Sequence, residues 1–281
     1  MKAKDLFRIK HRKPLDFCLF ALTWISIIAT ASILAFIIGY VLINGVPYLS
    51  PSLFAPEFNM ENQSLFPALV GTLMIVGLSL IVAVPLGVFS AIYLQEYSAR
   101  GSRFVKIVRM TTETLAGIPS IVYGLFGFLF FGGVLGWGLS LMSGTFTVSI
   151  MILPLIMRTT EESIKAVPDT YREGSFGLGA GRLRTVVRIV LPAAMPGILA
   201  GIILAIGRII GETAAIIFTL GNVARIPNSL FDTGRTLSAH MYQLSREGTH
   251  PGEAHATAAV LLLVVLLINA LSSRIARLIK T

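Results

Sequence analysis

Long stretches without a charged residue are the feature of this sequence that most restricts its fold. Residues 17–43 and 65–94 contain no Asp, Glu, Lys or Arg, and each can cross the apolar core of a bilayer as one helix, which takes roughly 20 residues. Residues 114–157 are also uncharged, but this stretch is too long for one ordinary helix. The glycines and serine within residues 132–144 predict a turn, so we expect two spans joined by a short hairpin.

Two further stretches complete the set of expected spans. Residues 189–224 are uncharged apart from Arg208 and Glu212, and residues 256–273 are uncharged throughout. Charged residues make up only 13% of the chain, which is about half the share in an average soluble domain. The sequence therefore predicts an all-α, polytopic membrane protein with six transmembrane helices, and it argues against a soluble enzyme.

The net charge of +9 would suit a nucleic-acid-binding protein, but the positions of the positive residues indicate a membrane topology instead. Nineteen of the 23 Lys and Arg lie before the first expected span, between the second and third, between the fourth and fifth, or after the sixth. Arg225, Arg235 and Arg246 lie in an opposite loop. Because cytoplasmic loops are enriched in Lys and Arg, we expect both termini in the cytoplasm and no nucleic-acid partner.

The first 64 residues are expected to form a peripheral unit made of a cytoplasmic N-terminus, the first transmembrane helix and an external loop. Residues 29–31 look like the small-residue cleavage site of a signal peptide, but the apolar stretch around them is too long for one. We therefore expect an uncleaved anchor in the bilayer. Residues 65–281 would form the main transmembrane domain with five helices.

The expected cytoplasmic loop, residues 158–192, carries the strongest pattern in the chain. Thr170 and Glu173 have the spacing of a capping box at a helix start, and we expect that helix to run through Leu178 and to break at residues 179–181. A basic helix then leads to Pro192, in the first turn of the next span. The small residues at 174, 175 and 177 would let a partner approach closely, although an amphipathic segment on the lipid headgroups would look similar.

The residues of this loop resemble a known family. The spacing Glu, two small residues, three residues, Gly, nine residues, Ile, one residue, Leu-Pro marks the permease subunits of ABC importers. It is found here in Glu173, Gly174, Ser175, Gly179, Ile189, Leu191 and Pro192. Gly174 and Ser175 stand where the family has two alanines. The resemblance implies a type I ABC importer permease fold, in which this loop is the coupling helix that docks on cytoplasmic ATPase subunits.

Two other segments resemble the phosphate branch of that family, in particular its PstA type. They are residues 117–127, in the third expected span, and residues 207–215, in the fifth. The resemblance implies import of inorganic phosphate across the bacterial inner membrane, with a second homologous permease subunit and a periplasmic phosphate-binding protein as partners. The chain contains no phosphate-binding loop of the Gly-x4-Gly-Lys-Ser/Thr type. We therefore expect it to bind no cofactor and to leave ATP hydrolysis to a separate subunit.

The charged residues of the fifth expected span are the candidates for the substrate pathway. Arg208 and Glu212 are four residues apart, so on one helix they would share a face and pair, and charges within a membrane usually face a cavity or the protein interior. The Arg fork suits a tetrahedral oxyanion. Glu212 would accept a hydrogen bond from the proton that phosphate carries and sulfate lacks, and would repel sulfate. A purely structural ion pair is the alternative. Arg158 is a weaker candidate for the inner mouth, with an interfacial anchor as its alternative.

The largest expected external loop, residues 221–253, contains a run at 236–246 that could form a surface helix. It is a candidate docking site for the binding protein, and a capping loop without a partner is the alternative. His240, His250, His255 and Glu253 are metal-ligand types, but their spacing matches no recognised site, so we expect no metal.

Several other functions fit part of this pattern. A permease for sulfate, molybdate or phosphonate is the nearest alternative. A secondary transporter also places ionisable residues within its spans, although the loop at 158–192 argues against it. A membrane component of phosphate sensing is the third.

Overall fold

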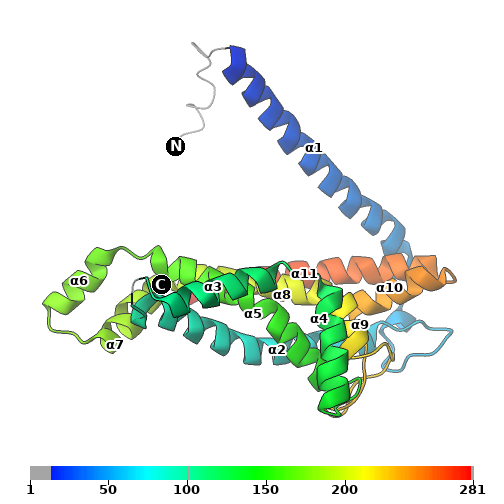
Figure 1. Ribbon diagram of the computed structural model, residues 1–281. Coiled ribbons are helices and arrows are strands. Elements are labelled where there is room, and N and C mark those ends of the chain that lie inside the picture. Colours follow the sequence, from blue (N-terminus) through cyan, green and yellow to red (C-terminus); the bar gives the residue numbers. More distant parts are fainter. Residues whose placement is uncertain (1–13, 100, 280–281) are drawn as a thin grey trace.

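The computed structural model describes residues 14–99 and 101–279, and this part of the chain is built of helices without strands (Figure 1). Five helices are long and apolar enough to cross a membrane, and a bent pair of helices makes a sixth crossing when it is counted as one span. The five are α1 (Pro14–Gly45), α2 (Phe66–Ile92), α5 (Leu141–Lys165), α8 (Leu191–Gly211) and α11 (Pro251–Ile279). The six Lys and Arg expected before the first span lie outside the described residues, as do Arg100 and Lys280.

The core forms where α5 packs between α2 and α8. Ile75 of α2, Ile152 of α5 and Ile209 of α8 belong to one cluster and are almost completely buried. Gly87 lets α2 approach α5, because a Cβ atom at this position would lie 2.8 Å from Cγ2 of Ile156. Small residues at such crossings are typical of membrane bundles, in which packing rather than water exclusion holds helices together.

The helix α1 stands apart from the bundle and meets it only near its C-terminal end (Figure 1). There Gly45 lies against the backbone of His255 on α11, and the ring centroids of Tyr40 and His255 are 5.7 Å apart. The large apolar side chains of α1 are exposed, which suits contact with lipid. Two 3₁₀ turns, η2 (Val46–Tyr48) and η3 (Pro51–Phe54), follow it.

The third crossing differs from the predicted single helix. The helix α3 (Arg103–Ala116) begins well before the uncharged stretch, and a bend of 100° separates it from α4 (Ser120–Gly127). The π-helical segment η5 (Phe128–Val134) continues α4 as one helix. Pro119 is the N-cap of α4 with an extended backbone, and a proline restricts the residue before it to extended conformations. The chain therefore turns at this position instead of continuing as one helix.

The predicted hairpin between the third and fourth spans is present. Gly136 and Gly138 have φ values of +69° and +61°, which glycine adopts without steric cost. Ser140 then caps α5 by accepting a hydrogen bond from the amide of Ser143 at 3.2 Å. The turn thus follows from glycines that permit it and a serine that starts the next helix.

The fifth span begins earlier and ends earlier than predicted. A short helix α7 (Arg182–Thr185), a π-helical turn η6 (Val186–Val190) and α8 run on as one helix from Arg182 to Gly211. Glu212 has an extended backbone, and a separate short helix α9 (Ala214–Thr219) follows. The prediction of one helix over residues 189–224 was therefore wrong beyond Gly211.

The two ends of the bundle carry different structures (Figure 1). The helix α6 (Asp169–Gly177) lies with α7 at one end, and the π-helical turn η4 (Tyr93–Tyr97) follows α2 there. The opposite end holds α9 and α10 (Leu237–Glu247). The predicted helix at 236–246 is confirmed as α10, with Thr236 accepting a hydrogen bond from the amide of Ala239.

Candidate functional site

The loop between α5 and α8 folds into two short limbs, as predicted. The first limb is α6, which ends near Leu178, and the second is α7. Gly179 between them has φ +81°, and its amide donates to the carbonyl of Phe176 at 2.9 Å. This left-handed residue reverses the chain at the break that the sequence predicted.

The capping box predicted for α6 does not form. The helix begins at Asp169 after Pro168, and no side-chain hydrogen bond caps it. Thr170 and Glu173 therefore lie inside the helix, because Pro168 sets its start two residues earlier than expected. Glu173 is exposed, so its carboxylate is available to another molecule.

The small residues of α6 divide between its two faces. Gly174 and Gly177 are exposed, with open space where a Cβ atom would stand. Ser175 is buried instead, and its hydroxyl lies 2.8 Å from that of Thr185 in α7. Ser175 thus holds the two limbs together, whereas Gly174 leaves the outer face of α6 open to a partner. The predicted contact of Ser175 with a partner stays a prediction.

Apolar side chains surround this outer face. Tyr171, Phe176 and Leu183 are about half exposed or more, and Leu178 is 92% exposed. A soluble protein rarely leaves such a group of side chains uncovered, and apolar patches of this kind mark interaction surfaces. The loop therefore has the character of a docking surface.

The last residues of the motif lie where the loop helix passes into the membrane span. Ile189 and Leu191 are half-buried, and Pro192 is exposed. Proline has no amide hydrogen and its ring collides with the carbonyl four residues earlier in an α-helix. The π-helical turn η6 ends two residues before Pro192, and the wider turn accommodates the ring without breaking the helix.

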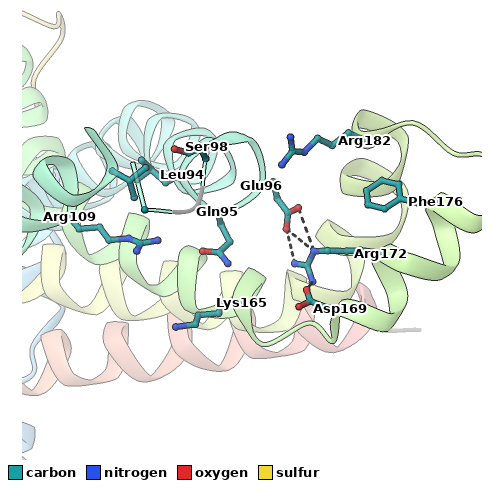
Figure 2. Close-up of a pocket in the computed structure, with 13 residues that line it drawn as sticks. Leu94, Gln95, Glu96, Ser98, Arg109, Lys165, Asp169, Arg172, Phe176 and Arg182 are labelled. Atoms are coloured by element: carbon teal, nitrogen blue, oxygen red, sulfur yellow. Dashed lines mark hydrogen bonds and ion pairs between the residues drawn. The ribbon is translucent and has the colours of Figure 1, made fainter. Parts of the chain in front are cut away.

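A cavity of about 650 Å³ lies beside the loop, between the end of α2 and α6 (Figure 2). An ion pair forms part of its lining, because the guanidinium of Arg172 lies 2.7 Å from the carboxylate of Glu96. Sequence reasoning missed both residues. The available signal was Glu96 itself, an acidic residue two positions after the end of the uncharged stretch at Leu94.

The structure does not form the predicted ion pair between Arg208 and Glu212. Arg208 lies in the last turn of α8, whereas Glu212 lies beyond the end of that helix. The Glu212 carboxylate accepts a hydrogen bond from the amide of Ala215 at 3.0 Å, and its backbone carbonyl accepts from the hydroxyl of Ser238 at 2.6 Å. The helix breaks because this carboxylate caps α9, so the two charges share no helical face.

Arg208 keeps an unusual position. Within the described residues its guanidinium has no hydrogen bond or ion pair, and it interacts electrostatically with Tyr123 of α4. Gly124 packs tightly on Ala215 of α9, since a Cβ atom at Gly124 would lie 2.8 Å from the Cα of Ala215. The two segments that resemble phosphate permeases therefore meet in space, with Arg208 beside their contact.

Arg158 and the histidines have simpler surroundings. Arg158 is exposed on α5 and pairs with Glu162 at 3.1 Å. His240 is buried against Arg235, and His255 bonds within its own helix. Among the described residues no group of three His, Cys, Asp or Glu is placed to hold a metal ion.

Comparison with known proteins assigns this architecture to a family. Residues 83–281 match the family described as "Binding-protein-dependent transport system inner membrane component". The chain belongs to this family. As a member, it is a multi-pass membrane permease subunit of an ABC importer.

Named relatives and solved structures agree with this assignment. This inner membrane component is 32% identical to the probable ABC transporter permease protein YqgI of Bacillus subtilis over 85% of its own length and 87% of the relative's. It is 34% identical to the phosphate transport system permease protein PstA of Haemophilus influenzae, over 78% of each chain. A chain of a solved bacterial alginate ABC transporter shares the fold with a TM-score of 0.70 and 19% identity, over 95% of this chain and 96% of that one.

Proposed function

We propose that this chain is the permease subunit through which an ATP-driven importer moves inorganic phosphate across the bacterial inner membrane. The observation that carries the proposal is Arg208, a guanidinium without a hydrogen-bonding or ionic partner in the described residues, next to the contact of α4 with α9. An Arg fork in a low-dielectric surrounding binds a tetrahedral oxyanion well. The identity of the similar PstA permease supports phosphate as that oxyanion.

The partners follow from the two ends of the bundle. We place the ATPase on the outer face of α6, around Glu173 and Gly174, with ATP bound and hydrolysed on that subunit alone. The periplasmic phosphate-binding protein would meet the opposite end, where α10 lies. A second homologous permease would complete the pathway, and we propose that both termini lie in the cytoplasm.

The first test is uptake of radiolabelled phosphate in cells that lack this chain and other phosphate transporters. Restoring the chain should restore ATP-dependent uptake that excess sulfate does not inhibit. Uptake of sulfate, molybdate or phosphonate instead would reject phosphate as the cargo. Loss of phosphate-dependent gene regulation with unchanged uptake would favour a sensing role.

We predict that Arg208→Gln lowers phosphate uptake by at least about tenfold, because a charge-assisted hydrogen bond to the anion is lost. Arg208→Lys should restore only part of the uptake, since a point charge replaces a fork of donors. The matched control is Arg274→Gln, which removes an exposed Arg at the end of α11. Normal uptake by an assembled Arg208→Gln transporter would remove Arg208 from the pathway.

A further inference from the structure

One side chain of α6, Arg172, joins this helix to two other elements of the bundle. The Nε and Nη2 atoms of Arg172 donate to Oε1 of Glu96 at 3.1 and 2.7 Å. Nη1 donates to the carbonyl of Val167 at 2.8 Å, and Nη2 to that of Ile164 at 3.1 Å. Nη1 also reaches Asp169 at 3.2 Å. One guanidinium therefore joins α6, the end of α5 and the turn η4 after α2.

The surroundings make this pair costly to separate. The side chains of Arg172 and Glu96 are only 14% and 9% exposed, so water screens their attraction weakly. Figure 2 shows the pair at the side of the cavity. Glu96 and Asp169 are the two acidic residues labelled there. Removing Arg172 would leave the buried Glu96 carboxylate without the partner that it has here, which proteins rarely tolerate. Removing Glu96 would leave Arg172 with Asp169 and two backbone carbonyls.

Two other side-chain contacts involve the loop. The hydroxyl of Ser175 contacts Thr185, which belongs to the same loop. The guanidinium of Arg182 in α7 lies 5.3 Å from the centre of the Tyr97 ring, a weaker contact to the same turn η4. Both limbs of the loop thus contact η4, and the ion pair is the stronger of these two contacts.

The turn η4 leads directly into α2, which is itself tied to the centre of the bundle. The hydroxyl of Ser79 on α2 donates to the carbonyl of Thr145 on α5 at 3.3 Å, and the hydroxyl of Ser149 donates to the carbonyl of Ser79 at 3.2 Å. A displacement of α6 that is carried into α2 therefore reaches the packed core. The loop also contacts the bundle through α7, which continues through η6 into α8, so the ion pair supplies the route into α2 in particular.

We propose that Arg172 and Glu96 are a positioning pair that transmits movement of the coupling loop into α2. The inference rests on the proposed function in one respect, which is that an ATPase moves α6. The pair does not contact the substrate or ATP. Its role is to keep α6 and α2 moving as one body when the ATPase closes and opens.

The test measures coupling rather than activity alone. The complete transporter, with its ATPase, second permease and binding protein, is reconstituted in proteoliposomes, and phosphate transported per ATP hydrolysed is determined. Glu96→Gln and Arg172→Gln should each lower this ratio by about tenfold, and the double variant should be no worse than either single one, because both remove the same interaction. Arg172→Lys should lower it less, and Arg274→Gln should leave it unchanged.

Assembly is measured beside the ratio. A normal ratio in assembled Glu96→Gln or Arg172→Gln transporters would overturn the proposal. Failure of both Arg172→Lys and Glu96→Gln to assemble would also overturn it, because the pair would then serve folding. If the native transporter moves no phosphate, the proposed substrate is wrong. The inference is then tested by the ATPase rate, because docking of the binding protein should stimulate ATP hydrolysis less in the variants than in the native transporter.

Discussion

At the scale of single residues, Arg235 is a buried charge that is held by uncharged partners. Arg235 is 8% exposed, and its Nε and Nη2 atoms donate to the carbonyl of Asn222 at 3.2 and 2.7 Å. Its Nη1 donates to Nδ1 of His240 at 3.0 Å, so Nε2 of that ring carries the proton and donates to the carbonyl of Gln63 at 3.3 Å. The network joins α10 to the segment before α2.

This network predicts a pH dependence of stability. Burial and the neighbouring charge of Arg235 lower the pKa of His240 from 6.5 to about 4, against weaker opposing effects of the Gln63 carbonyl and Glu247. Between those two pH values the unfolded chain binds more protons than the folded one, so the free energy of unfolding falls as pH drops from 6.5 to 4. The contribution of neutral His240 is fully present above pH 6.5. The shift corresponds to about 3 kcal/mol.

The measurement is the thermal unfolding temperature of the purified protein in detergent at several pH values from 7.5 to 4.5. His240→Gln can accept from Arg235 and donate to Gln63 without titrating, so this variant should unfold at a temperature that depends less on pH. An equal pH dependence in both proteins would assign the effect to other groups.

At the scale of elements, turns and prolines decide where helices end or adapt. Pro119 separates α3 from α4, while Pro192 is accommodated by the turn η6 within a continuous helix. Both are prolines in apolar surroundings, and both remove a backbone donor. The outcome differs because Gly117 precedes the first as the C-cap of α3, whereas a π-helical turn precedes the second.

The turn between α6 and α7 gives a prediction at this scale. Gly179→Ala should destabilise the turn by about 1 kcal/mol, because φ +81° is unfavourable for any residue with a Cβ atom. Hydrogen exchange at the amides of residues 179 and 180 should then be about fivefold faster, since both close the end of α6. Gly177→Ala is the matched control, because it lies in the helix in open space, and it should not accelerate exchange.

At the scale of the whole molecule, burial rises from α1 to the centre. The apolar side chains of α1 face outward, whereas α5 is enclosed by α2, α4 and α8. Lipid replaces water around α1, so its exposed side chains gain little from protein contacts. The stability of the bundle therefore depends on packing around α5.

A pair of truncations tests this difference. Ile152→Ala, in α5, removes a completely buried side chain and should lower the free energy of unfolding by about 2–5 kcal/mol. Ile33→Ala, in α1, removes a side chain that is 59% exposed and should change it by less than about 0.5 kcal/mol. The comparison is made by thermal unfolding in detergent, and equal shifts would contradict the central role of α5.

The sequence by itself determined the features that depend on local chemistry. Uncharged stretches located the membrane helices, except for the bend in the third crossing and the end of the fifth at Gly211. Glycines located the hairpin at residues 132–144 and the break at Gly179, and Thr236 located the start of α10. The spacing from Glu173 to Pro192 also located the loop and its family. These features follow from backbone conformation and hydropathy, which are properties of residues close together in the chain.

Only the tertiary structure decided which distant residues meet. It brought Glu96 to Arg172, separated in sequence by 76 positions, and it separated Arg208 from Glu212, which lie only four apart. The physical reason is the same in both cases. A buried charge takes the partner that packing presents to it, and for Glu212 that partner is the amide of Ala215 at the start of α9, so the pairing depends on how the helices pack rather than on sequence spacing.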